Sequence, residues 1–208
     1  TLLILINDIL DFSKINAGRL EFEVIDFSPE TLMEEVLSML AEPAQRKGLE
    51  LCCIADPAIP ICMGGDPNRV RQVLTNLVGN AIKFTDTGSV IIRVMLEDQQ
   101  ENTATIKIAI TDTGVGLTIE QQKALFRTFQ QADTSTARRF GGTGLGLAIT
   151  KHLVAQMDGK VGLESKEGEG STFWFTIKAK INHQSTQVLP SPNQSGNCTL
   201  AIYDKLPE

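Results

Sequence analysis

The sequence contains few of the residues that build metal centres and disulfide frameworks. It has four cysteines, at positions 52, 53, 62 and 198, and only two histidines, His152 and His183. No two cysteines have CxxC spacing and no histidine accompanies them in a cluster, so a zinc site is not expected. This cysteine usage favours a reduced, cytosolic setting.

The chain also lacks a basic excess and a long apolar run. It has 19 lysines and arginines against 25 acidic residues, a net charge of −6, and no basic stripe, which argues against nucleic-acid binding. The early apolar run from Leu2 to Ile6 is too short to span a bilayer. Because the sequence opens inside a helical pattern without Met or a signal peptide, we expect a fragment of a longer protein.

Hydrophobic residues make up 42% of the 208 residues, enough for one domain with a real core. Their periodicity predicts helices over 1–18, 28–47, 67–84, 118–126 and 144–157, and strands over 20–24, 49–54, 89–97, 103–111, 160–165, 171–177 and 198–203. Pro43 predicts a kink or a break near Ala41. Helices that alternate with antiparallel hairpins predict a two-layer α/β sandwich, with helices on one face of a mixed sheet.

The remaining stretches lack periodicity. Residues 127–143 are polar and predict a mobile loop, and residues 182–197 form a Ser/Pro/Asn/Gln linker. Residues 198–208 begin either a further domain or a disordered tail, and the sequence favours neither.

The helix from Asp66 to Phe84 carries an unusual polar face. Its apolar residues follow the i, i+3, i+4 pattern of one buried face, while Asn76, Asn80 and Lys83 lie within roughly 60° on the opposite side. Amide oxygens suit a hard cation and an ammonium suits a phosphate. Taken alone, the face is better explained as a solvated helix surface.

Asp112 follows a predicted strand whose isoleucines face inward, and it is in phase with them. Its carboxylate is therefore expected on the buried side, where it needs a hydrogen-bond donor such as the exocyclic amine of adenine. Gly114 and Gly116 follow and would let the backbone approach a flat ligand. The alternative is an ordinary Asp-Thr-Gly turn.

Two glycine-rich motifs follow. The segment Gly141 to Leu147 joins a loop to a helix start, where free N–H groups and the helix dipole bind anions, although a flexible hinge is the alternative. It is neither a Walker A loop nor a Rossmann fingerprint. The segment Gly168 to Phe173 would by itself be a hairpin turn with an inward aromatic.

In this order, the four signals resemble the N, G1, G2 and G3 boxes of the ATP-binding domain of sensor histidine kinases, the Bergerat or GHKL fold. Phe126 to Phe129 resembles the F box of that family, and Asn7 to Lys14 resembles the end of its dimerisation helix. The resemblance covers residues 1–180 and is nearest to hybrid sensor kinases of the GacS/BarA type. It implies residues 1–18 as part of the dimerisation hairpin, 19–181 as the ATP-binding domain, and a receiver-like domain or tail after 198.

The resemblance also implies roles for single residues. Asn80 would bind Mg²⁺ at the phosphates of ATP with Asn76 assisting, Lys83 would contact phosphate, and Asp112 would select adenine. The further residues implied at the nucleotide are Gly114, Gly116, Arg138, Arg139, Gly142, Thr143, Gly144, Leu145, Gly146 and Thr172. For Arg138 and Arg139, a solvated loop charge is an equally good explanation. Phe126 and Phe129 would anchor the lid; core packing explains them equally well.

Asn76 bears on the reaction, because related ATP hydrolases carry a glutamate at that position to activate water. Asparagine cannot act as a general base, so the resemblance favours phosphotransfer to histidine over an ATPase or a degenerate interaction module. Neither His152 nor His183 has the context of an acceptor histidine. The implied partners are therefore an acceptor helix upstream in a homodimer and a response regulator receiver domain, with the domain cytoplasmic and the parent protein anchored in the inner membrane.

Overall fold

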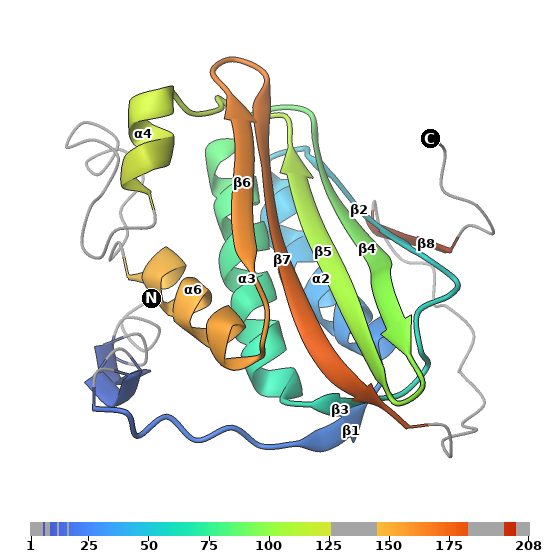
Figure 1. The fold of residues 1–208 in the computed structure, drawn as a ribbon. Coiled ribbons are helices and arrows are strands. Elements are labelled where there is room, and N and C mark those ends of the chain that lie inside the picture. The colour runs from blue at the N-terminus through green and yellow to red at the C-terminus, as the bar shows by residue number, and fades with distance from the viewer. Residues whose placement is uncertain are drawn as a thin grey trace.

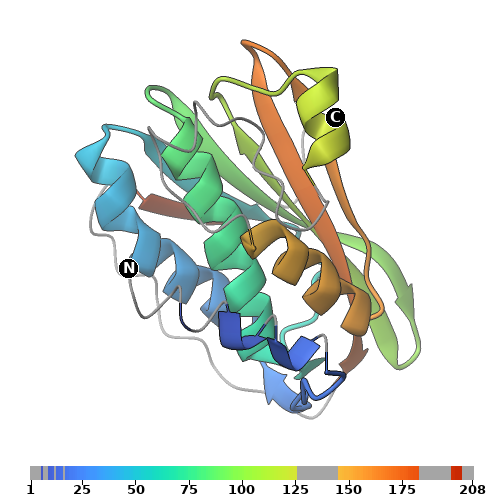
Figure 2. The ribbon, with the colours of Figure 1, turned by 90° about the vertical axis from the view of Figure 1, so that its left-hand side faces the viewer.

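The computed structural model describes residues 6, 9–11, 13–15, 17–125, 145–182 and 198–202. In these residues one sheet is covered on one face by three helices, α2, α3 and α6 (Figures 1 and 2). The helices are α2 (Pro29–Arg46), α3 (Pro67–Phe84), α4 (Ile119–Ala124) and α6 (Gly146–Gln156). The strands are β1 (Ile25–Phe27), β2 (Glu50–Ala55), β3 (Met63–Gly65), β4 (Ser89–Gln100), β5 (Thr103–Asp112), β6 (Val161–Lys166), β7 (Gly170–Ile181) and β8 (Cys198–Ile202).

The sheet is mixed, with strand order β1-β3-β7-β5-β4-β2-β8 and with β6 paired to β7. Strand β2 pairs in parallel with both β4 and β8, while the other pairs are antiparallel. The predicted two-layer sandwich with helices on one face is therefore confirmed. The core lies between the layers, where Leu77 of α3, Ile108 of β5 and Phe175 of β7 are buried.

Helix α3 forms where the sequence predicts it, because both its start and its buried face are encoded locally. Asp66 is the N-cap, and its side chain accepts hydrogen bonds from the backbone N–H groups of Asn68 and Arg69, each at 3.1 Å. Pro67 occupies the first turn, where its missing N–H costs nothing. All seven predicted apolar residues, Val70, Val73, Leu74, Leu77, Val78, Ala81 and Ile82, are buried.

The predicted strand over 20–24 is wrong. Residues 20–24 have no strand partner, and the strand lies instead at Ile25–Phe27, where it pairs antiparallel with Met63–Gly65. Leu20 and Phe22 still pack against the core from the irregular segment. Side chains in this segment therefore alternate between half-buried and exposed although the backbone pairs with no strand. The strand was predicted from this alternation alone.

No break occurs at Pro43, since α2 continues from Pro29 to Arg46. The carbonyl that loses its helical donor to proline is that of Met39, whose side chain is about half exposed on the solvent side. Water can satisfy a carbonyl on that side, which makes the proline tolerable.

The β4–β5 hairpin is longer than predicted, since β4 runs to Gln100 and the turn narrows to residues 101–102. The register shifts between Leu96 and Asp98, and this bulge accommodates the polar end of β4. Strand β8 forms at the predicted place and lies at the edge of the same sheet (Figure 1). That residues 198–208 open a further domain stays a prediction.

Trp174 lies on the face of the sheet opposite the helices. It is paired with Gly162 of β6, where a Cβ atom would lie 2.2 Å from the indole, so the ring lies across the glycine. The ammonium of Lys107 lies 4.7 Å from the ring centroid, a cation–π contact.

Candidate nucleotide site

Asn76 lies where α3 packs against α6. Its Nδ2 donates to the hydroxyl of Thr150 at 2.9 Å, and Thr150 is buried in α6. A Cβ atom at Gly146, the first residue of α6, would lie 2.4 Å from Asn76 Oδ1. The amide is thus held between two positions of α6, and a side chain at 146 would have to displace it.

This approach predicts opposite effects for two glycine-to-alanine substitutions. Gly146→Ala should lower the free energy of unfolding by about 1–3 kcal/mol, because the new methyl collides with Asn76. Gly79→Ala, inside α3 with nothing within 4 Å of the new Cβ, should raise it by about 0.5–1 kcal/mol. Urea unfolding of both variants measures the difference, and equal effects would contradict the helix contact.

Asn80 and Lys83 follow Asn76 on the same face of α3 at spacings of four and three residues. Both side chains are half-buried. The Lys83 ammonium lies 4.9 Å from the centroid of the Phe84 ring, and burial lowers the pKa of this lysine from its ordinary value. No hydrogen bond holds the Asn80 side chain to another described residue, so its amide can turn toward a ligand.

Asp112 is buried, 6% exposed, as its phase in the strand predicts. One carboxylate oxygen accepts the Gly114 N–H at 2.9 Å. Burial raises the pKa of the carboxyl, while hydrogen bonds from the backbone of Gly114 and Ser171 oppose that rise. The second oxygen can still accept from a ligand.

The end of α3 meets the segment after Asp112. A Cβ atom at Gly114 would lie 2.5 Å from the Phe84 carbonyl oxygen, so only glycine fits between helix and strand end. At Gly116, whose φ is +65°, a Cβ atom would lie closer still, 1.9 Å from the carbonyl oxygen of Lys166 in β6. The structure therefore brings the polar face of α3, Asp112 and both glycines to one end of the sheet.

Lys47 is a supporting residue that the sequence does not indicate. Its ammonium donates to the carbonyl oxygens of Ile82, Lys83 and Thr85 at 2.9, 2.8 and 3.1 Å. These carbonyls lie at the C-terminal end of α3, where a cation is favourable. Lys47 thus anchors the helix end that carries Lys83 and borders Asp112.

Lys47→Met should therefore lower the free energy of unfolding by about 1–2 kcal/mol and weaken nucleotide binding several-fold. Arg46→Met is the matched control, because the Arg46 pair with Glu42 is exposed on both sides. Thermal unfolding and titration with an ATP analogue test both effects. Equal behaviour of the two variants would contradict the anchoring role.

The family model described as "Histidine kinase-, DNA gyrase B-, and HSP90-like ATPase" matches residues 65–181. The chain belongs to this family. The matched residues include all of α3, Asp112 and the start of α6. The family model therefore covers the elements that form the candidate site. The predicted Bergerat fold is that of the family and is confirmed.

Curated relatives support the membership. Sensor protein GacS of Pseudomonas syringae pv. syringae is 50% identical over 85% of this chain and 20% of its own length. Signal transduction histidine-protein kinase BarA of Escherichia coli K12 is 43% identical over 99% of this chain and 24% of its own length. The predicted similarity to the GacS/BarA type is confirmed, and the chain spans about a fifth to a quarter of these relatives.

Solved structures agree. Full-length ShkA in complex with AMPPNP superposes with a TM-score of 0.76 at 32% identity, covering 87% of this chain and 36% of ShkA. The histidine kinase AdeS of Acinetobacter baumannii superposes with a TM-score of 0.62 at 24% identity, over 88% of this chain and 79% of AdeS, which supports the fold alone.

Within this family member, Thr172 does not share the face of Asp112. It pairs with Thr111, whose hydroxyl lies 3.1 Å away, on the face that also carries Trp174. Ser171 pairs directly with Asp112 and is buried on the helix side. The structure thus places Ser171, not Thr172, beside the Asp112 carboxylate. Because side chains alternate between the two faces of a strand, the inward-facing Phe173 predicts that Ser171, two residues earlier, also faces inward.

Several predicted residues lie outside the described residues: Phe126, Phe129, Arg138, Arg139, Gly142, Thr143 and Gly144. Of the glycine-rich segment, Leu145 is buried and Gly146 begins α6. The N-cap position is Leu145, which provides no side-chain cap. A helix start next to Asn76 is suited to an anionic ligand.

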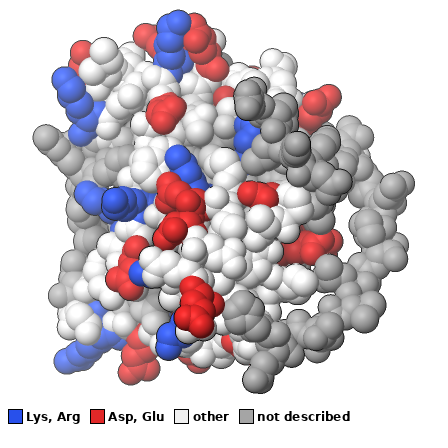
Figure 3. Space-filling model, turned by 45° about the vertical axis from the view of Figure 1, so that its right-hand side comes forward, with Lys and Arg blue, Asp and Glu red and all other residues white. Residues whose placement is uncertain are grey.

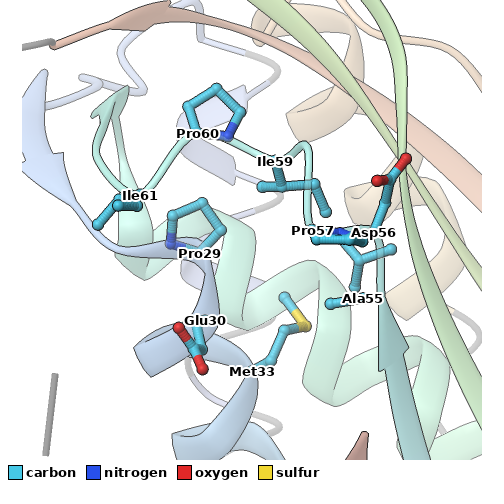
Figure 4. A pocket seen from close by; sticks show the side chains of 10 residues that line it. Pro29, Glu30, Met33, Ala55, Asp56, Pro57, Ile59, Pro60 and Ile61 are labelled. Atoms are coloured by element: carbon cyan, nitrogen blue, oxygen red, sulfur yellow. The ribbon is translucent and has the colours of Figure 1, made fainter. Parts of the chain in front are cut away.

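One hollow lies elsewhere, between the start of α2 and the end of β2, where Pro29, Met33 and Ile59 line it (Figure 4). It contains none of the predicted nucleotide residues. A shallower hollow at the β6–β7 turn includes Ser171 and Thr172. Among the described residues no group of three or more His, Cys, Asp or Glu side chains could hold a metal ion by itself.

Charges are mixed on the face shown in Figure 3, where blue and red side chains alternate over the described part and form no continuous basic band. This agrees with the acidic composition. None of the described helices is both long and apolar enough to cross a bilayer.

Proposed function

We propose that this chain is the ATP-binding catalytic domain of a sensor histidine kinase, which transfers the γ-phosphate of ATP to a histidine outside the sequence. The observation that carries the proposal is the amide at Asn76, held by Thr150 beside the start of α6. An amide cannot take a proton from water, so the face lacks a general base for hydrolysis at this position. Transfer to a histidine needs positioning and charge neutralisation instead.

Adenine recognition rests on Asp112. The carboxylate is buried and has lone pairs left to accept from a donor such as the adenine amino group, while Gly114 removes a side chain that would fill the space above it. Ser171 borders the same carboxylate and is proposed as a further contact. Gly116 shapes the adjoining wall.

The phosphates belong on the polar face of α3 and at the start of α6. The amide oxygen of Asn80 is a suitable ligand for Mg²⁺, with Asn76 holding the neighbouring geometry, and Lys83 contributes positive charge. Since no described cluster could hold the ion alone, the nucleotide phosphates would complete its coordination. Mg²⁺, when bound, neutralises charge on the phosphates. We assign Arg138, Arg139, Gly142, Thr143 and Gly144 to the loop that covers the triphosphate.

The same proposal implies which partners the domain has. Residues 1–18 belong to the dimerisation hairpin of a homodimer, residues 19–181 form the catalytic domain, and a receiver domain takes the phosphoryl group from the histidine. ATP supply places the domain on the cytoplasmic side of an inner-membrane protein.

Two assays test the proposal. The first titrates the chain with a fluorescent ATP analogue and Mg²⁺, where saturable binding is expected. The second joins the acceptor-histidine helix of a sensor histidine kinase ahead of Thr1, so that residues 1–18 complete the hairpin, and supplies γ-labelled ATP, where an acid-labile phosphohistidine is expected. Steady phosphate release by the unfused chain would favour an ATPase instead, and failure to bind nucleotide would favour an interaction module.

A further inference from the structure

Asp11, in the helical stretch ahead of β1, is bound to the start of α3. One of its carboxylate oxygens accepts from Gln72 Nε2 at 2.7 Å and from Arg69 Nη1 at 3.2 Å. Arg69 also donates to Gln72 Oε1 at 2.9 Å, so the three side chains close a ring of hydrogen bonds. The Asp11 and Arg69 side chains are only 14% and 22% exposed, which distinguishes this pair from a solvated surface ion pair.

A second set of hydrogen bonds joins the segment before β1 to the start of α3. Asp66 caps α3 with one carboxylate oxygen and accepts the backbone N–H of Glu23 with the other, at 3.1 Å. Between the contacts of Asp11 and Glu23, Ile15 and Leu20 pack against the core. The segment that leads from the helix to β1 is therefore fastened to the first turns of α3 (Figure 2).

The ring and the nucleotide residues share one face of one helix. At 100° per residue, Arg69 and Gln72 lie within roughly 80° of Asn76, Asn80 and Lys83. Arg69 precedes Asn76 by seven residues, or about 10 Å along the axis. Since α3 is one unbroken helix, a rotation of the preceding helix about this ring changes the direction in which the nucleotide face points.

We propose that Asp11, Arg69 and Gln72 are positioning residues for phosphotransfer. They fix the orientation of the ATP site relative to the helix that continues toward the acceptor. Ile9 and Leu10 on that helix are about half exposed, which leaves an apolar face for the rest of the helical hairpin. The inference rests on the proposed function and adds to it the side-chain contacts that orient the γ-phosphate toward the acceptor histidine.

The fusion with the acceptor-histidine helix tests this role at saturating ATP. Asp11→Asn and Arg69→Ala should each slow phosphohistidine formation by about tenfold to a hundredfold, because the donor and acceptor are no longer aligned. Affinity for the ATP analogue should stay within about twofold, since neither residue belongs to the nucleotide site. The exchanged pair, Asp11→Arg with Arg69→Asp, should recover part of the lost rate.

Arg71→Ala is the matched control, because Arg71 lies on the same helix and forms one ion pair, with Glu35 of α2. It should leave the transfer rate unchanged. Hydrogen exchange in the unfused chain gives a readout independent of kinase activity: Arg69→Ala should speed exchange over residues 9–23 and Arg71→Ala should not. Unchanged exchange, an unchanged transfer rate, or equal losses in the two arginine variants would overturn the role. Absence of phosphohistidine in the unsubstituted fusion would instead count against the proposed function.

Discussion

Asp112→Asn is expected to weaken ATP binding by about tenfold to a hundredfold and to leave the nucleotide-free protein at least as stable. A hydrogen bond from the adenine amino group to an ionised carboxylate contributes roughly 1.5–3 kcal/mol, and asparagine removes the charge. The asparagine oxygen can still accept the Gly114 N–H, so the local fold is retained. The affinity for ATP should therefore fall in this variant while the free energy of unfolding does not.

The direction of the pKa shift gives the expected pH dependence of stability. Burial raises the pKa of the Asp112 carboxyl above the ordinary 3.8, so the folded chain holds the proton more tightly than the unfolded chain. Stability therefore falls as the pH rises from the unfolded pKa through the folded pKa, and the ionised carboxylate costs stability at neutral pH. Because asparagine does not titrate, the advantage of Asp112→Asn should be largest at pH 7 and shrink toward pH 4.

Titration calorimetry with an ATP analogue and thermal unfolding at pH 7 and pH 5 measure the two effects. Asp86→Asn serves as the control, since Asp86 is exposed just beyond α3. Unchanged affinity of Asp112→Asn would remove Asp112 from adenine recognition. A stability difference that grows on acidification would contradict the direction of the shift.

Asn80→Ala is expected to lower phosphotransfer by about a hundredfold or more and to change stability little. A metal ion at transferring phosphates contributes several kcal/mol to transition-state stabilisation, and Asn80 is the side chain assigned to it. Because no described residue is hydrogen-bonded to the Asn80 side chain, its removal should not disturb the fold.

The Mg²⁺ dependence of analogue binding separates this role from packing. Asn80→Ala should lose the Mg²⁺-dependent part of the affinity and keep the rest. Asn68→Ala, at the start of the same helix and paired with Arg71, should bind as the unsubstituted chain does. If Mg²⁺ strengthens binding equally in all three proteins, Asn80 is not the metal ligand.

The parts of the site that depend on local signals were predictable from the sequence. The Asp66-Pro67 start, the apolar stripe of α3 and the alternation of β5 placed the polar face and buried Asp112 without tertiary information. These signals are short-range, and the tertiary structure leaves them intact.

The remaining parts depend on contacts between distant segments. Lys47 and Thr150 act across 35 and 74 residues, and nothing in their own neighbourhoods marks them. Thr172 was chosen because it lies in a recognised motif, while strand pairing gives the place beside Asp112 to Ser171. Residues 20–24 alternate in burial but lack a partner strand, which only the folded chain reveals.

Trp174 is the only tryptophan of the chain, and it lies across Gly162 on the face of the sheet away from the helices. Its indole is therefore shielded by the sheet itself from a ligand bound against Asp112 on the other side. Emission from this ring will respond when β6 and β7 separate and will be nearly indifferent to nucleotide occupancy. The protein thus carries an intrinsic fluorophore that reports its unfolding at any ATP concentration.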